Sequence, residues 1–344
     1  MSSNGAGPVD GPTGRDDPRP AEDVTQHHDE ALVATEEVAP TVRAEKSVDL
    51  ATGPARPGVP KKDPILVADH ITRSFGGVHA VDVDHVEIPR HAITALIGPN
   101  GAGKTTLFNL LSGFDRPDTG EWEFNGRSLS GIPAWKAARR GQVRTFQLTK
   151  VLNRLTVLDS MKLGASKQKG ESLLFSVLPF TWRAQEKQIE ERALVLLEKF
   201  KLLDKKDDYA AALSGGQRKL LEMARALMTD PTMIMLDEPM AGVNPALTQS
   251  LLGHIQSLRD EGMTVLFVEH DMHMVRHISD WVVVMAEGRI VAEGPSDTVM
   301  SDPAVIDAYL GAHHDTDLGD DDLLSDEVMA DLAQEAEQEG HEHG

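Results

Sequence analysis

The sequence predicts an α/β fold with a mainly parallel central sheet, and three observations lead to this prediction. A glycine-rich turn at residues 98–106 follows the largely apolar run 93–97 and precedes a helix-forming segment. Two further runs, 233–236 and 264–268, are also largely apolar, have the length of strands and end in polar or charged residues. Short, continuous apolar runs are typical of parallel strands buried on both faces.

Residues 1–63 are predicted to form a disordered tail. They are rich in glycine, proline, alanine and acidic residues, contain no aromatic residue and show no sustained periodicity. Such a segment buries too little apolar surface to offset the entropy lost when its backbone is ordered. The folded part is expected to begin at Pro64, after a cluster of prolines.

Two strand-like pieces, 65–71 and 78–88, alternate apolar and polar residues around the turn Phe75-Gly-Gly77. A sheet at this position offers a surface for a purine, and Phe75 is the candidate for stacking on it. An equally open interpretation is that Phe75 is a buried aromatic residue at the end of a strand.

The turn at residues 98–106 fits the pattern G-x-x-x-x-G-K-[ST], which is typical of a phosphate-binding loop. Its backbone N–H groups form a concave anion site, and the helix that begins near Lys104 adds the positive end of its dipole. Lys104 can reach the β- and γ-phosphates, and the Thr105 hydroxyl can ligate Mg²⁺. The candidate nucleotide-binding residues of this turn are Gly98, Asn100, Gly101, Ala102, Gly103, Lys104, Thr105 and Thr106.

The middle of the chain is predicted to be largely helical. Residues 107–113 continue the first helix, and residues 121–126 form a strand that ends in an Asn-Gly turn. From 158 to about 206 apolar residues recur at helical spacing. Residues 173–182 are mostly apolar, which leaves two interpretations open: burial in the domain, or an exposed surface for a partner.

A second anion site is predicted at Ser214, Gly215, Gly216 and Gln217, directly before a helix-forming segment. Ser214 has the character of a helix N-cap, and the two glycines expose backbone at the helix entrance. Helix N-termini of this kind bind anions.

The polar residues after the two buried runs have the chemistry needed for transfer of a phosphoryl group from ATP to water. Asp237 is the expected Mg²⁺ ligand, directly or through water, beside Thr105. Glu238 is the candidate to polarise the attacking water, and His270 the candidate to sense or hold the γ-phosphate. A lone histidine at the end of a strand is more often structural, but its place after the other motifs favours a catalytic role.

The rest of the sequence supports one folded domain between two acidic ends. Residues 281–285 and 289–292 are predicted to form a hairpin, and residues 305–311 to close the domain. Residues 312–344 carry twelve acidic residues and no lysine or arginine, and residues 1–63 have a net charge of −5, so the middle carries only −4 of the total −21. This balance argues against nucleic-acid binding, which usually needs a basic surface.

Composition excludes several classes of protein. With no cysteine among its 344 residues, the chain cannot be a disulfide scaffold. Its N-terminus lacks the apolar core of a signal peptide, and no run approaches the roughly 18 apolar residues of a membrane span. Any action at a membrane is therefore expected to depend on a partner.

Taken together, these motifs resemble those of ABC ATPases, the nucleotide-binding subunits of ATP-binding-cassette systems. The resemblance covers about residues 64–311 and depends on five features in the family's order: the phosphate loop 98–106, Gln147 in Arg144-Thr-Phe-Gln147, the signature 213–217, the pair Asp237-Glu238, and His270. It implies a P-loop NTPase cassette with a RecA-like mixed sheet core, an antiparallel β subdomain and an α-helical subdomain at about residues 148–228. The ends, 1–63 and 312–344, are then tails outside the cassette.

The resemblance also implies how the two anion sites act together. Two cassettes, either two copies or this chain and a paralogue, pack head to tail so that ATP lies between Lys104 of one and Ser214 of the other. Gln147 contacts Mg²⁺ or the attacking water and links the site to the helical region, where a transmembrane permease subunit docks. The implied location is the cytoplasmic face of the cell membrane. Asn244 stands where many members have aspartate, so that acidic dimer contact is not carried over.

A finer resemblance is to the ATPases of branched-chain amino acid importers, in which an extracytoplasmic solute-binding protein takes part indirectly. It depends on the segments 75–81, 241–245, 268–272 and 306–311. ATPases of urea importers and of a lipopolysaccharide exporter share much of this pattern, so these systems stay open as alternatives.

An alternative of another class is a soluble ABC ATPase that acts on ribosomes or nucleic acid. Such proteins have two tandem cassettes, or one cassette interrupted by a long coiled coil. This chain has a single set of motifs, no heptad array and no excess of basic residues. A degenerate, purely structural cassette is disfavoured because every catalytic position is filled.

Overall fold

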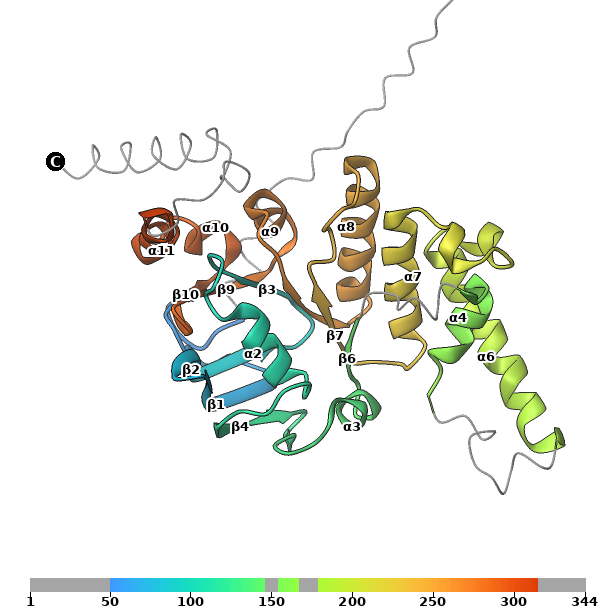
Figure 1. Ribbon diagram of the computed structural model, residues 1–344, viewed down its shortest axis with the longest axis horizontal. Coiled ribbons are helices and arrows are strands. Elements are labelled where there is room, and N and C mark those ends of the chain that lie inside the picture. Colours follow the sequence, from blue (N-terminus) through green and yellow to red (C-terminus); the bar gives the residue numbers. More distant parts are fainter. Residues whose placement is uncertain (1–49, 146–153, 167–178, 315–344) are drawn as a thin grey trace, which may run out of the picture. The chain divides into compact units, whose positions relative to one another are not determined.

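The computed structural model describes residues 50–145, 154–166 and 179–314 (Figure 1). Gln147, residues 173–178 of the apolar segment and the two ends, 1–49 and 315–344, lie outside this part. What was predicted for them stays a prediction.

The strands are β1 Pro64–Phe75, β2 Val78–Pro89, β3 Ile93–Ile97, β4 Thr119–Phe124, β5 Arg127–Ser128, β6 Gln142–Arg144, β7 Met233–Asp237, β8 Thr264–Val268, β9 Trp281–Ala286 and β10 Arg289–Gly294. The helices are α2 Lys104–Leu111, α3 Ala134–Arg139, α4 Val157–Leu163, α6 Pro179–Lys199, α7 Gly215–Leu227, α8 Pro245–Asp260, α9 Met272–Ile278, α10 Ser296–Val299 and α11 Pro303–His314, with 3₁₀ turns η3 Leu203–Lys205 and η4 Ala210–Ala212. The predicted hairpin is confirmed as β9 and β10, and the last helix runs three residues beyond the predicted end of the domain at 311.

The central sheet has the strand order β10-β9-β3-β8-β7-β6. Strands β9, β3, β8, β7 and β6 run parallel, and β10 is antiparallel to β9. Every residue of β3 and β8 is buried, as the apolar runs predicted. Along β3, Ile93, Ala95 and Ile97 belong to one apolar cluster and Leu96 to the other, so the sheet is covered on both faces. The predicted mixed α/β sheet is confirmed.

A second sheet, of order β2-β1-β4-β5, is entirely antiparallel. The predicted Asn-Gly turn joins β4 to β5, with a positive φ at both Asn125 (52°) and Gly126 (64°). Both residue types adopt this conformation readily, and it matches the twist of the two flanking strands. Figure 1 shows this sheet beside α2.

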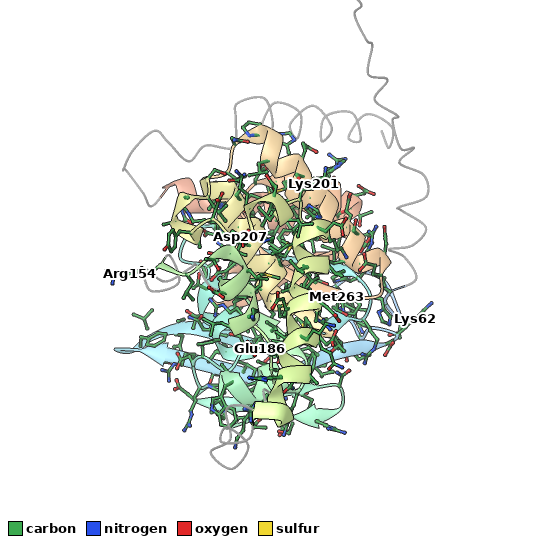
Figure 2. All side chains as sticks on the ribbon, turned by 90° about the vertical axis from the view of Figure 1, so that its right-hand side faces the viewer. Lys62, Arg154, Glu186, Lys201, Asp207 and Met263 are labelled. Atoms are coloured by element: carbon green, nitrogen blue, oxygen red, sulfur yellow. The ribbon has the colours of Figure 1, made fainter. Side chains whose placement is uncertain are left out.

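The helical region expected after residue 158 is present. Helix α4 contacts both α6 and α7, and Ala193, Leu197 and Phe200 of the α6 region are fully buried. Figure 1 shows these helices beyond α8, away from the antiparallel sheet. Figure 2 looks from that side and shows Glu186 on α6 in front of the sheets.

The predicted N-terminal tail is corrected at residues 50–63, which are folded against the domain. Val59 is 1% exposed, and Ala51 forms an isolated β-bridge with Lys61. The Lys61 ammonium is buried, 2.8 Å from Oε2 of Glu293 and 4.6 Å from the centre of the Trp281 ring. Glu293 also accepts bonds from the backbone N–H of Val59 and from the Trp281 indole. The composition of the segment does not indicate that it is folded, because an ion pair between residues far apart in the sequence leaves no local pattern.

Replacing Lys61 is expected to destabilise the fold. Lys61→Ala leaves Glu293 as a buried carboxylate without its cation, which typically costs about 3 kcal/mol or more. Denaturant unfolding of the full chain measures the change in the free energy of unfolding. Arg56→Ala is the matched control, because Arg56 is an exposed cation of the same segment and its loss is expected to cost less than about 0.5 kcal/mol. Equal effects of the two changes would show that the ion pair does not anchor the segment.

Candidate nucleotide-binding and catalytic site

The predicted phosphate loop leads from β3 into α2, as the motif requires. Gly98, Gly101 and Gly103 have φ values of 147°, 81° and 93°, a region that favours glycine. A Cβ at Gly98 would overlap the carbonyl oxygen of Met285, and one at Gly103 would overlap that of Ala80. The loop is therefore packed directly against neighbouring backbone, and its curled shape depends on glycine at these two positions.

Lys104 begins α2 and lies over the loop. Its Nζ donates to the carbonyl oxygens of Gly98, at 2.6 Å, and Pro99, at 2.9 Å. Burial lowers the pKa of Lys104, and the negative charge of Glu238 opposes this shift. The lysine and the candidate water-polarising carboxylate are thus close enough to interact electrostatically, while the neighbouring Thr105 is exposed.

Strand register brings the carboxylates and the histidine to the phosphate loop. Leu96 of β3 pairs with Val268 of β8, which pairs with Asp237 at the end of β7. The backbone N–H of Glu238 donates to Val268 O at 3.1 Å, and Glu238 has a positive φ of 42°. His270 follows two residues after Val268, with 61% of its side chain exposed. Asp237, Glu238 and His270 therefore emerge at adjacent strand ends.

Arg144 is a site residue whose role the sequence did not reveal. It ends β6 opposite Met235, and its guanidinium is 2.6 Å from Oδ2 of Asp237. The same group donates to Asn109 and Ser112 of the first helical segment and lies 4.7 Å from the centre of the Phe108 ring. An arginine within the motif around Gln147 was visible, but only the register of β6 with β7 assigns it to Asp237.

Phe75 is exposed at the end of β1, with a relative exposure of 49%. The interpretation as a buried strand-end aromatic is therefore wrong. The Arg73 guanidinium lies 4.6 Å from the centre of the Phe75 ring and is held by Asp115 and Asp118. Stacking on a purine stays a prediction, and the ring has the exposure and support that stacking requires.

The second anion site has the predicted helix cap. Ser214 Oγ accepts from the backbone N–H of Gln217 at 3.3 Å, and the Gln217 side chain accepts from the Ser214 N–H at 3.0 Å. In this capping box the side-chain carbonyl oxygen of Gln217 is bonded to the N-terminus of its own helix. Ser214 and Gly215 are exposed, whereas Gly216 is buried against Leu247. Figure 1 shows α7 and α2 well separated, with α8 between them.

The residues present fit a nucleotide with its metal. The glycines let the loop curl tightly against neighbouring backbone, Lys104 carries the cation, and the side chains of Thr105 and Asp237 carry oxygen atoms of the kind that Mg²⁺ prefers. Arg144 contacts Asp237 through one carboxylate oxygen, Oδ2. In the part of the chain that the structure describes, no helix has both the length and the apolar character of a membrane span.

Known proteins share this architecture. A family model described as ABC transporter matches residues 81–241, and one described as branched-chain amino acid ATP-binding cassette transporter matches residues 289–315. The probable branched-chain amino acid transport ATP-binding protein LivG of Archaeoglobus fulgidus is 40% identical over 248 residues, or 72% of this chain and 96% of the relative. The high-affinity branched-chain amino acid transport ATP-binding protein BraF of Pseudomonas aeruginosa is 38% identical over 250 residues, or 72% and 98%.

Solved structures of ATP-binding cassettes have the same fold. A nucleotide-free ATP-binding cassette from an ABC transporter matches with a TM-score of 0.64 at 38% identity, covering 72% of this chain and 98% of that one. The ADP conformation of an ATP-binding cassette of an ABC transporter matches with a TM-score of 0.63 at 37% identity, covering 72% and 99%.

Removing the Phe75 ring is expected to weaken nucleotide binding. Stacking of a base on an aromatic side chain contributes about 1–3 kcal/mol, so Phe75→Ala should weaken ATP binding roughly tenfold. Calorimetric titration of the full chain with ATP measures the dissociation constant. The control is Val78→Ala, which removes an exposed apolar side chain across the same turn and should leave binding unchanged. Unaltered affinity in Phe75→Ala would exclude the stacking role.

Proposed function

The chain belongs to the ABC transporter family of ATPases, and from this premise we propose that it hydrolyses ATP between two cassettes to drive a permease that imports branched-chain amino acids or similar solutes. The observation that carries the proposal is the arrangement of its two anion sites. The phosphate loop lies beside the strand-end carboxylates, whereas the Ser214 turn is exposed elsewhere on the same chain.

Different residues of the chain have different roles in hydrolysis. Lys104 and the backbone of the phosphate loop bind the phosphates and offset their negative charge. Glu238 accepts a proton from the attacking water, which makes that water a better nucleophile. His270 holds the γ-phosphate oriented toward this water. The exposure of Glu238 and His270 beside the loop supports these roles, because both side chains are free to face a bound nucleotide.

Thr105 and Asp237 are the described residues that would hold Mg²⁺, and Gln147 is proposed as a third. The metal, when bound, neutralises charge on the β- and γ-phosphates. Arg144 fixes the orientation of the Asp237 carboxylate, because its guanidinium is itself held in place by hydrogen bonds to Asn109 and Ser112.

A second cassette completes the ATP site. Ser214 and Gly215 present a capped helix N-terminus to solvent, and such a terminus attracts phosphate. Since α7 does not approach α2 of its own chain, the phosphate that this turn binds is proposed to belong to ATP held by another copy or by a paralogous ATPase. Nucleotide then joins the two subunits, and hydrolysis releases them.

The transported solute is proposed from two independent similarities. The relatives described above are named as branched-chain amino acid transport proteins, and residues 289–315 match a family model with the same description. We therefore favour this solute class over urea and lipopolysaccharide, and a transporter over an ATPase acting on ribosomes or nucleic acid. The chain would then work at the cytoplasmic face of the membrane, bound to permease subunits, with an extracytoplasmic solute-binding protein as an indirect partner.

Replacing the proposed base tests the chemistry. Glu238→Gln keeps the shape of the side chain but cannot accept the proton, so ATP turnover should fall by at least about a hundredfold while ATP binding persists. Phosphate release measures turnover, and size-exclusion chromatography with ATP should show a longer-lived dimer than for the wild-type chain, with the partner ATPase added if this chain alone stays monomeric. Turnover at the wild-type rate would remove Glu238 from the role of base.

Isolation of the complex tests the biological role. The full chain, recovered from gently solubilised membranes, is expected to bring permease subunits with it, and leucine-loaded binding protein should stimulate ATP hydrolysis of the reconstituted complex. Stimulation by urea-loaded binding protein instead would change the solute class. Recovery of ribosomes without any membrane subunit would contradict the transport function.

A further inference from the structure

Glu269, between β8 and His270, is a buried carboxylate that the catalytic scheme above does not use. The residue is 1% exposed. Its Oε1 accepts from the backbone N–H of Met240 at 3.0 Å, and its Oε2 accepts from the backbone N–H of His270 at 3.3 Å. Among the described residues, its one ion-pair contact is with the His270 ring, at 3.7 Å.

Keeping a carboxylate in this position is energetically unfavourable. Burial raises the pKa of Glu269, the two backbone hydrogen bonds oppose that shift, and the nearby charge of Glu238 reinforces it. A buried carboxylate without a lysine or arginine partner is stabilised chiefly by the N–H groups that it accepts. The two backbone N–H groups whose hydrogen bonds Glu269 accepts therefore indicate its role.

The first of these groups fixes the segment that carries the proposed base. Met240 lies two residues after Glu238, whose own N–H donates to Val268 O. The segment is thus tied to the end of β8 at two points, once through the backbone and once through the Glu269 side chain. This anchorage holds Glu238 in its left-handed conformation, which costs energy for a residue other than glycine.

The second group fixes the backbone of His270, so one side chain sets the positions of both proposed catalytic groups. The loop 238–244 continues to the second anion site of the same chain. The Lys219 ammonium of α7 donates to Glu238 O at 3.3 Å, and a Cβ at Gly216 would lie 3.2 Å from Val243. Glu269 therefore holds one side of a loop whose other side packs against the Ser214 helix.

We propose that Glu269 is a positioning residue for ATP hydrolysis, which holds the backbone of Met240 and His270 so that Glu238 and His270 face the same γ-phosphate. This inference rests on the proposed function and deepens it. Glu269 itself touches neither ATP nor the attacking water. Its effect should appear in the rate of the chemical step and not in nucleotide affinity, because the phosphate loop and Phe75 do not depend on it.

The test is Glu269→Gln in the full-length chain. Glutamine keeps the volume, but its NH₂ group cannot accept a backbone N–H, so one of the two bonds is lost. Loss of a charge-assisted hydrogen bond predicts a fall in kcat of about tenfold. The KM for ATP and the dissociation constant for ATP in a non-hydrolysing background should stay within about twofold of the wild-type values, because the altered group acts only after ATP has bound.

A matched control separates positioning from general stability. Glu293 is also a buried carboxylate that accepts a backbone N–H, but it lies at the Lys61 ion pair and outside the site. Glu293→Gln is expected to lower the melting temperature while leaving kcat unchanged. Glu269→Gln should lower kcat even at temperatures at which circular dichroism shows both variants to be folded.

The outcomes distinguish this inference from the function on which it rests. Absence of hydrolysis by the wild-type chain in its complex, or full hydrolysis by Glu238→Gln, would overturn both. If those two proteins behave as expected, a wild-type kcat in Glu269→Gln would overturn the positioning role alone. A tenfold loss of ATP affinity with kcat preserved, or an equal loss of kcat in Glu293→Gln, would likewise assign Glu269 a structural role only.

Discussion

The hydrogen-bond register of three neighbouring strands is the constraint on which the site depends. Leu96, Val268 and Asp237 form one row across β3, β8 and β7, and the chain leaves the sheet just beyond it. The phosphate loop, Glu238 and His270 therefore start from adjacent positions. A slip of one residue would turn each side chain of a strand to the opposite face and move these polar groups out of line. The buried ladder thus sets the geometry of a reaction that takes place outside it.

The charges around this row compensate one another in different ways. Asp237 has Arg144 as a direct ionic partner, whereas Lys104 and Glu238 interact at longer range above the loop. Among the described residues, Glu269 has no lysine or arginine partner and accepts backbone N–H groups instead. Buried charges are costly unless they are paired or hydrogen-bonded. Each compensating group also fixes the orientation of its partner, so the same contacts stabilise the buried charges and orient the proposed catalytic groups.

Local sequence patterns predicted the conformation of the phosphate loop and the Ser214 helix cap, because these motifs are continuous segments with their own geometry. The glycines of the phosphate loop, the Ser214 cap and the apolar runs before Asp237 and His270 needed no knowledge of the fold. The contacts that were missed join residues far apart in the chain. Arg144 reaches Asp237 only through the pairing of β6 with β7, and Lys61 meets Glu293 across 232 positions. Such pairs leave no periodicity or motif, so composition alone predicts a disordered tail that includes the folded segment 50–63.

The loop 238–244 provides a physical connection between the two proposed anion sites of a single chain. One end carries Glu238, which is proposed to act on this chain's own ATP. The other packs through Val243 against Gly216, next to the Ser214 turn proposed for the neighbour's ATP. Packed interiors rearrange between discrete arrangements and do not deform continuously. A movement of this loop that displaced Glu238 would therefore also displace the helix terminus, so in the proposed dimer a change at one ATP site would reach the other through contacts within one subunit.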